Sequence, residues 1–256
     1  MSPTSSIHNS ASEQTVTPEM IDAAGYEPLI HTMGNGFTLP YRRLVANPEK
    51  PGPFSLMIFF HGTGSVGADN FLQMRIPGLP FARYLAKHQL KSILLFPQCR
   101  PKNQWVNVPW SDYSHDLPQV PSEHMAAAME VVQSTIREYE ISPSAVYAGG
   151  ISMGGYAAWD IVCRMPQTFS AILAICGGGD VKQAHRIRHL RVCDYHGSLD
   201  PAVPVARSRE MVAALRAFDN DNILYREFPE AGHNVWDAAF ADDVALDFIY
   251  QPQNRI

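Results

Sequence analysis

The sequence predicts an α/β fold, with a mostly parallel central sheet, helices on both faces and an N-terminal antiparallel hairpin. Short apolar runs alternate with stretches of helical periodicity, which is typical of strands buried on both faces of a parallel sheet. Residues 26–46 alternate in polarity around a Gly-Asn-Gly turn, as a hairpin does. Residues 146–159 pass from a strand-like run through a glycine-flanked serine into an Ala-rich helical run.

The elements can be assigned in chain order from these patterns. After the hairpin we expect buried strands at 54–60, 92–96, 144–149, 169–176, 192–195 and 222–228. Helices are expected at 79–88, 122–140, 152–164, 205–218 and 237–250. The gaps between strands are of helix length except for long loops at 61–80 and 97–121, so no large cap domain is expected.

Composition indicates a soluble protein with a sizeable core. The chain has 256 residues, of which 46% are hydrophobic and 18% charged, and this fits a single domain over residues 21–256. The net charge is −5 and no block of Lys or Arg is present, which argues against nucleic acid as a partner. No apolar run approaches the roughly 18–20 residues of a membrane span.

The N-terminal residues 1–20 are expected to form a polar arm. They are rich in Ser and Thr and lack a basic start followed by an apolar core, so they do not resemble a secretory signal. The default expectation is a cytoplasmic protein, and a secreted mature form that has lost its signal stays open. The four cysteines match no zinc spacing, and we expect buried thiols rather than disulfides.

The stretch Gly150-Ile-Ser-Met-Gly154 has the G-x-S-x-G pattern of a nucleophile elbow. In such a strand–turn–helix the serine is strained, and flanking glycines avoid clashes. The hydroxyl of Ser152 would then project above the carboxyl edge of the sheet. The alternative is that Ser152 only caps the helix.

Two turns downstream supply the partners that a nucleophilic serine needs. Asp200 lies just past a strand and His233 follows the last strand, which gives the chain order Ser, Asp, His. His233 would accept the serine proton and Asp200 would orient His233. Asp194 is the alternative acid, but it lies inside a strand. We expect the remaining histidines to be solvated, apart from His61.

The run His61-Gly-Thr-Gly64 follows a buried strand and would form part of an oxyanion hole. One backbone N–H would come from Thr63 or Gly64 and the other from Met153, the residue after the nucleophile. We expect His61 to brace this loop, although it could serve as a base. The glycines at 177–179 lack phosphate-loop spacing, and we expect them to let the backbone pass close to the site.

Aromatic residues near the expected site are candidate substrate contacts. Trp105 and Trp110 lie in the loop after the 92–96 strand, where such loops wall the ligand crevice. Trp236 lies in the segment that carries His233.

Together these motifs resemble the α/β-hydrolase carboxylesterases, in particular the predicted peptidase and phospholipase/carboxylesterase branch related to feruloyl esterases and polyhydroxybutyrate depolymerases. The matching stretches are His61-Gly62, Pro97-Gln-Cys99, Gly150–Gly155, Ile175–Gly179, His196–Pro204, Ser208–Met211 and Gly232–Trp236. The resemblance implies the triad Ser152, Asp200 and His233, with no cofactor and no metal.

The expected activity is that of a serine carboxylester hydrolase working through an acyl-enzyme on short-chain or aromatic esters. Two alternatives stay open: a serine peptidase, and a non-catalytic ligand-binding protein on the same scaffold. The oligomeric state does not follow from the sequence.

Overall fold

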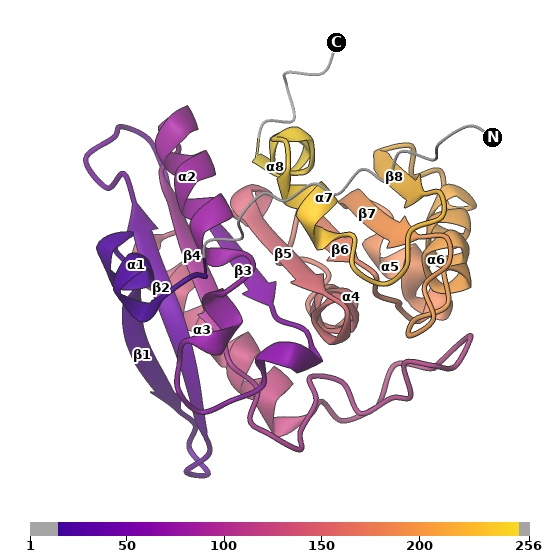
Figure 1. Ribbon diagram of the computed structural model, residues 1–256, viewed down its shortest axis with the longest axis horizontal. Coiled ribbons are helices and arrows are strands. Elements are labelled where there is room, and N and C mark those ends of the chain that lie inside the picture. The colour runs from indigo at the N-terminus through magenta and orange to yellow at the C-terminus, as the bar shows by residue number, and fades with distance from the viewer. Residues whose placement is uncertain (1–14, 251–256) are drawn as a thin grey trace, which may run out of the picture.

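A computed structural model describes residues 15–250, which form one eight-stranded sheet covered by helices on both faces (Figure 1). The strands are β1 (Glu27–Thr32), β2 (Thr38–Ala46), β3 (Ser55–Phe60), β4 (Ser92–Pro97), β5 (Val146–Ile151), β6 (Ala171–Ile175), β7 (Arg191–Gly197) and β8 (Ile223–Phe228). The helices are α1 (Pro18–Ala23), α2 (Gly78–His88), α3 (Glu123–Tyr139), α4 (Met153–Arg164), α5 (Ala184–Ile187), α6 (Ala206–Arg216), α7 (Trp236–Phe240) and α8 (Val244–Tyr250).

The sheet has the order β1-β2-β4-β3-β5-β6-β7-β8. The pairs β1–β2 and β2–β4 are antiparallel, and all others are parallel. This confirms the predicted fold class, including the N-terminal hairpin. Because β3 to β8 run in the same direction, their carboxyl ends meet at one edge of the sheet, where the following loops lie together.

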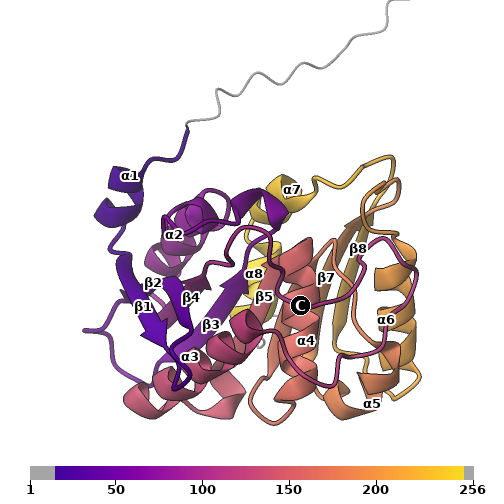
Figure 2. The ribbon, with the colours of Figure 1, turned by 90° about the horizontal axis from the view of Figure 1, so that it is seen from below.

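Each face of the sheet carries its own apolar core. One core packs α3, α4, α5 and α6 against the sheet, and the other packs α1, α2, α7 and α8 against the opposite face. Figure 2 shows α1, α2 and α7 on one side of the strands and α3 to α6 on the other. Strand side chains alternate between the cores: Ile58 and Phe60 face the first, and Met57 and Phe59 the second.

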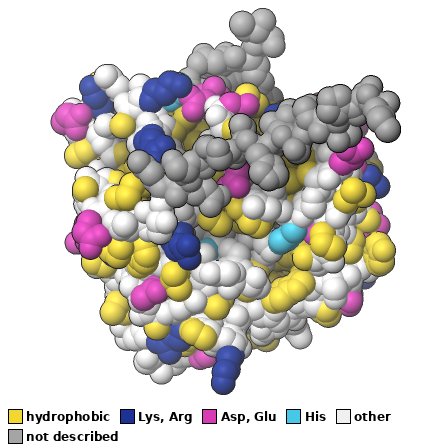
Figure 3. Space-filling model, in the orientation of Figure 1, with side chains coloured by type: hydrophobic (Ala, Val, Ile, Leu, Met, Phe, Trp, Pro, Cys, Tyr) yellow, Lys and Arg dark blue, Asp and Glu magenta, His cyan; other side chains and the backbone are white. Residues whose placement is uncertain are grey.

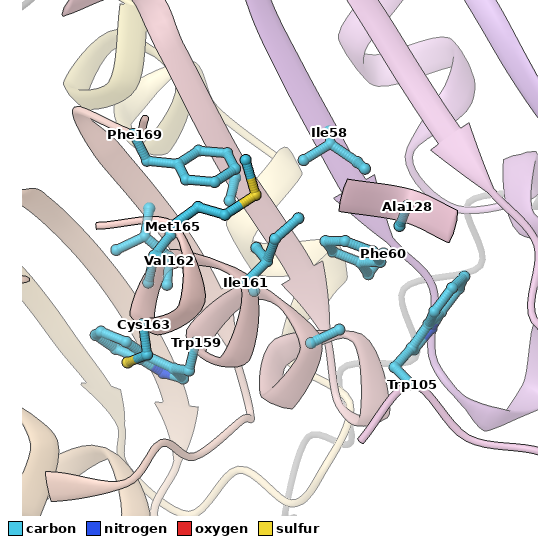
Figure 4. Packing of buried hydrophobic residues seen from close by; sticks show 14 of the residues in the cluster. Ile58, Phe60, Trp105, Ala128, Trp159, Ile161, Val162, Cys163, Met165 and Phe169 are labelled. Carbon is cyan, nitrogen blue, oxygen red and sulfur yellow. The ribbon is translucent and has the colours of Figure 1, made fainter. Parts of the chain in front are cut away.

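Helix α4 is the most deeply buried helix, because it lies between the sheet and the loops of the first face. Every residue from Met153 to Cys163 is buried. Figure 4 shows Trp159, Ile161 and Val162 of this helix among the side chains of the first core. The close approach of α4 to the sheet edge requires small residues, since a Cβ on Gly155 would lie 2.8 Å from the Cα of Gly177. The glycines after β6 therefore allow close passage of the backbone, as predicted.

Two terminal elements differ from the prediction. The expected arm at residues 1–20 overlaps α1, which Thr17 caps and whose Ile21 is fully buried, while residues 1–14 lie outside the described part. The single helix expected at 237–250 is two helices. Asp242 accepts a hydrogen bond from the Val244 N–H at 3.1 Å and so starts a new helix.

The surface carries no large charged block on the face shown in Figure 3, where basic and acidic side chains are interspersed. All four cysteines are buried, as predicted. Within residues 15–250, none of the helices combines the length and apolar character needed to cross a membrane.

Candidate active site

The candidate nucleophile lies in the turn between β5 and α4. Ser152 has φ 56° and ψ −119°, a conformation that non-glycine residues rarely adopt. Its N–H donates to the carbonyl of Ile175 at 2.7 Å, so the neighbouring strand holds the turn in place. The Ser152 side chain makes no capping hydrogen bond to the helix, which disfavours the reading as a simple cap.

Glycines on both sides make the turn possible. A Cβ on Gly150 would lie 2.0 Å from the carbonyl oxygen of Gly154, and a Cβ on Gly154 would lie 2.0 Å from the carbonyl oxygen of Phe60. Atoms do not approach so closely, so neither position tolerates a side chain. The steric reason expected for the two glycines of the motif is confirmed.

The structure brings Ser152, His233 and Asp200 into one hydrogen-bonded line. The Nε2 of His233 lies 2.8 Å from the Ser152 Oγ, and its Nδ1 lies 2.6 Å from the Asp200 Oδ2. Because Asp200 accepts, Nδ1 carries the proton and Nε2 can accept the proton of the serine. The His233 side chain is 24% exposed and the Asp200 side chain is fully buried.

Asp200 is held as an anion by its surroundings. Its Oδ1 accepts from the N–H groups of Ala202 at 2.8 Å and Val203 at 2.9 Å. Burial by itself would raise the pKa of Asp200, but hydrogen bonds from His196, His233 and these amides outweigh it and hold that pKa well below its usual range. An ionised carboxylate beside His233 favours the imidazolium that forms when His233 takes a proton.

The loop after β3 is braced by His61, as expected. Its Nε2 accepts from the Cys99 N–H at 2.9 Å, so its Nδ1 carries the proton and donates to the Gly62 carbonyl at 2.7 Å. Burial lowers the pKa of His61 to about 4, which keeps it neutral. Both ring nitrogens are therefore occupied by the backbone.

Backbone N–H groups converge near Ser152 from two elements. Met153 is the first residue of α4, where the N–H has no acceptor within the helix. Across from it, residues 63–65 form a short 3₁₀ turn, whose Ser65 and Val66 amides bond to the carbonyls of Gly62 and Thr63. The amides of Thr63 and Gly64 stay as candidates for binding an oxyanion.

A cavity of about 630 Å³ lies beside Ser152 and His233. Its lining includes the apolar side chains of Ile76, Trp236 and Phe240 and the charged side chains of Arg75 and Asp237. The Trp236 ring stands edge-to-face on the His233 ring, with centroids 5.6 Å apart. The structure thus places Trp236 where the sequence analysis expected a substrate contact.

The other two tryptophans do not line this cavity. Trp105 is fully buried and lies beside Phe60 (Figure 4). Its indole N–H donates to the His61 carbonyl at 3.1 Å. The expectation that Trp105 forms a substrate wall is therefore corrected: its ring packs on Phe60 and His61 and supports the loop from behind. Trp110 is partly buried and lines a separate surface depression near residues 104–111.

Sequence reasoning missed several residues near the site. The expectation that the remaining histidines are solvated is wrong for His124 and His196, which are buried. Thr15 and Val16, assigned to the arm, line the cavity. The signal for His196 was its position at a strand end four residues before Asp200; nothing marked Thr15 or Val16.

One group of side chains among the described residues has the donor types of a metal site. The ligand atoms of Cys176, His196 and Asp200 lie within 4.8 Å of one another. The arrangement does not suit a metal, because the Asp200 Oδ2 already accepts from His233 and burial raises the pKa of the Cys176 thiol. A protonated thiol is a poor metal ligand.

Residues 42–251 match the model of the phospholipase/carboxylesterase family. The chain belongs to this family. The match includes all three residues of the hydrogen-bonded line. A search of curated proteins finds no match.

Solved esterase structures share the fold of this family member. A thermostable esterase is 28% identical with a TM-score of 0.79, over 88% of this chain and 62% of that one. The chain thus spans less than two thirds of that esterase. A ferulic acid esterase is 15% identical with a TM-score of 0.64, over 88% and 98% of the two chains. A puromycin-hydrolyzing peptidase of Mycobacterium tuberculosis is 15% identical with a TM-score of 0.62, over 88% and 38%.

Proposed function

We propose that the protein is a serine carboxylester hydrolase that acts through an acyl-enzyme on short-chain or aromatic carboxylic esters. The observation that carries the proposal is the hydrogen-bonded line Ser152–His233–Asp200, whose serine and histidine line a cavity of mixed polar and apolar character. Membership of the phospholipase/carboxylesterase family supports the same class of reaction.

In the proposed reaction, the Ser152 Oγ attacks the ester carbonyl while the His233 Nε2 takes its proton. The carbonyl oxygen becomes negative and is stabilised by the N–H groups of Met153 and of Thr63 or Gly64. His233 then gives the proton to the leaving alcohol, which departs and leaves an acyl group on Ser152. Water, deprotonated by His233, releases the acid and restores the serine.

The cavity lining supports small or flat acyl groups. Trp236 and Phe240 offer aromatic surface close to Ser152, and Ile76 completes an apolar wall. A cavity of about 630 Å³ is in the range of small-molecule sites. We therefore expect p-nitrophenyl acetate or butyrate, or methyl ferulate, to be turned over faster than p-nitrophenyl laurate.

The decisive test is Ser152→Ala. Loss of the nucleophile should lower kcat for the preferred ester by roughly 10⁶-fold, as in other serine hydrolases, without unfolding the protein. The matched control is Ser170→Ala, which removes a serine just before β6, where the Oγ donates to the Ser144 carbonyl at 2.8 Å. Unchanged turnover in Ser152→Ala contradicts the proposal. Turnover of peptides but not of any ester would favour a peptidase.

A further inference from the structure

A second histidine lies behind the acid of the proposed triad. His196, the penultimate residue of β7, is fully buried, and its Nε2 is 3.2 Å from the Asp200 Oδ2. The same Nε2 lies 3.0 Å from the Val203 carbonyl oxygen. Both neighbours are hydrogen-bond acceptors, because Asp200 is ionised, so Nε2 must carry a proton and donate it.

The other side of the His196 ring is fixed by α6. Its Nδ1 is 2.8 Å from the Oγ of Ser208, and the same Oγ is 2.7 Å from the Asp194 Oδ1. Ser208 and Asp194 are both 0% exposed. Close polar contacts thus run from Asp194 through Ser208, His196 and Asp200 to His233 and end at Ser152, and the longest of them is the 3.2 Å contact between His196 and Asp200.

Burying this many polar groups beside one carboxylate is costly unless each is hydrogen-bonded. Asp194 is the least satisfied, since its Oδ2 has no hydrogen-bond partner among the described residues. A simple structural role would be served as well by apolar side chains at these positions. The series of polar contacts instead leads to the carboxylate of Asp200, which orients His233.

We propose that His196 is a positioning residue for the reaction: it donates its Nε2–H to Asp200 and so holds the carboxylate against His233. Ser208 and Asp194 hold the His196 ring in the orientation that this donation needs. The inference rests on the proposed function, because it assigns a role toward the proposed triad.

The other titratable groups that face this series of polar contacts are already paired or neutral. They are Cys176 after β6, Cys193 on β7, Tyr225 and Glu227 on β8, and Tyr156 on α4. Glu227 is paired with Arg209 of α6 at 2.5 Å and accepts from the Tyr225 hydroxyl, and Tyr156 donates to the Trp110 carbonyl. Burial raises the pKa of both thiols, which keeps them protonated. Asp200 therefore receives side-chain hydrogen bonds from His196 and His233.

Two substitutions of His196 separate the two sides of its ring. His196→Asn places an amide where Nδ1 was, so it can still meet Ser208 but does not reach Asp200. His196→Gln places an amide N–H where Nε2 was, so it can still donate to Asp200. The pair therefore tests the donation to Asp200 with side chains of similar polarity.

The measurement is kcat and KM for p-nitrophenyl acetate from about pH 5 to about pH 9, the range in which a histidine base changes charge. His196→Asn should lower kcat roughly tenfold, in line with the loss of other outer hydrogen-bond partners, with little change in KM. In the plot of kcat/KM against pH, the rising limb should also move to higher pH. Without the donor, Asp200 keeps more negative charge, which stabilises the protonated form of His233. His196→Gln should stay close to the wild type in both respects.

The inference would be overturned if kcat fell equally in the two variants. It would also be overturned if a folded His196→Asn protein kept the rising limb of its kcat/KM profile at the wild-type pH. Thermal melting establishes whether each variant is folded. Should His196→Asn not fold, Ser208→Ala, which removes a single oxygen, should give the same two changes to a smaller extent, and no change would again overturn the inference. Failure of the proposed function looks different, because Ser152→Ala would then keep wild-type turnover.

Discussion

Two loops at the carboxyl edge of the sheet differ in length and in what their side chains do. The loop after β7 is short, and its Asp200 accepts hydrogen bonds from two histidines and two backbone amides. The loop after β4, residues 98–122, is long, and its Trp105 is fully buried behind the site. The short loop presents a polar group to the proposed chemistry, whereas the long loop contributes support for the turn at 62–65.

Some features of these loops can be located from the sequence, and others require the structure. A polar side chain just after a parallel strand lies at the shared edge of the sheet, whatever the loop does next. An aromatic side chain in a long loop can turn outward or inward, and packing partners from distant segments decide which. The ring of Trp105 lies inward because it packs on Phe60 and His61.

Of the two loops, the short one carries the larger expected effect on activity. Asp200→Asn should lower kcat by about 10⁴-fold with the fold intact, because an amide can donate to His233 and hold it in the wrong tautomer. Steady-state kinetics on the preferred ester checks this. Asp180→Asn is the matched control, since Asp180 is also buried and accepts backbone N–H groups, but outside the triad. A similar loss in both variants would mean that the effect is not specific to Asp200.

The tryptophans allow a direct test of the contrast between support and substrate contact. Trp105→Ala should lower the free energy of unfolding by about 3–5 kcal/mol, the usual cost of emptying a buried aromatic site. Trp236→Ala should cost less stability, because Trp236 is only partly buried, but should change the order of preference along an ester series. Denaturant unfolding and kinetics of both variants check this. A changed ester preference in Trp105→Ala with an unchanged one in Trp236→Ala would reverse the assignment.

The smallest expected effect concerns Asp194 and the pH dependence of stability. Burial raises the pKa of Asp194 from 3.8 to about 6. The folded state then binds a proton that the unfolded state releases, so this contribution to stability is present below about pH 4 and is lost as the pH rises to about 6.

The variant Asp194→Asn lacks this titration. Its free energy of unfolding relative to the wild type should therefore increase between about pH 4 and pH 6, by up to about 3 kcal/mol. Urea unfolding at several pH values measures this difference. A difference that is constant with pH would show that Asp194 does not titrate in this range.

Most of the fold follows from local patterns. The buried strands were located to within about two residues, because a parallel strand must be apolar on both faces. The elbow at Ser152 was recognisable, because only glycine fits at positions 150 and 154. The hydrogen-bonded order of Ser152, His233 and Asp200 follows from topology, since all three follow parallel strands.

What the sequence did not predict depends on contacts between distant segments. The side chain of Asp242 stabilises the break between α7 and α8. Because this cap was not recognised in the sequence, the segment was predicted as one helix. The position of His196 at a strand end could be seen in the sequence, but its contact with Ser208 could not, because it depends on the packing of α6 on β7. The contribution of Val16 to the cavity lining likewise joins residues that are far apart in the sequence.

The burial of every cysteine has a practical consequence for chemical labelling. Burial raises the pKa of the Cys99 and Cys163 thiols to about 12 and that of the Cys176 and Cys193 thiols further, so none is a ready nucleophile in the folded protein. Alkylating reagents should therefore leave the folded protein unmodified and react with it only as it unfolds. Under the proposed function, an organophosphorus probe, which reacts with activated serines, should label only the folded state. The two reagents together would separate the loss of activity from the loss of structure in any variant.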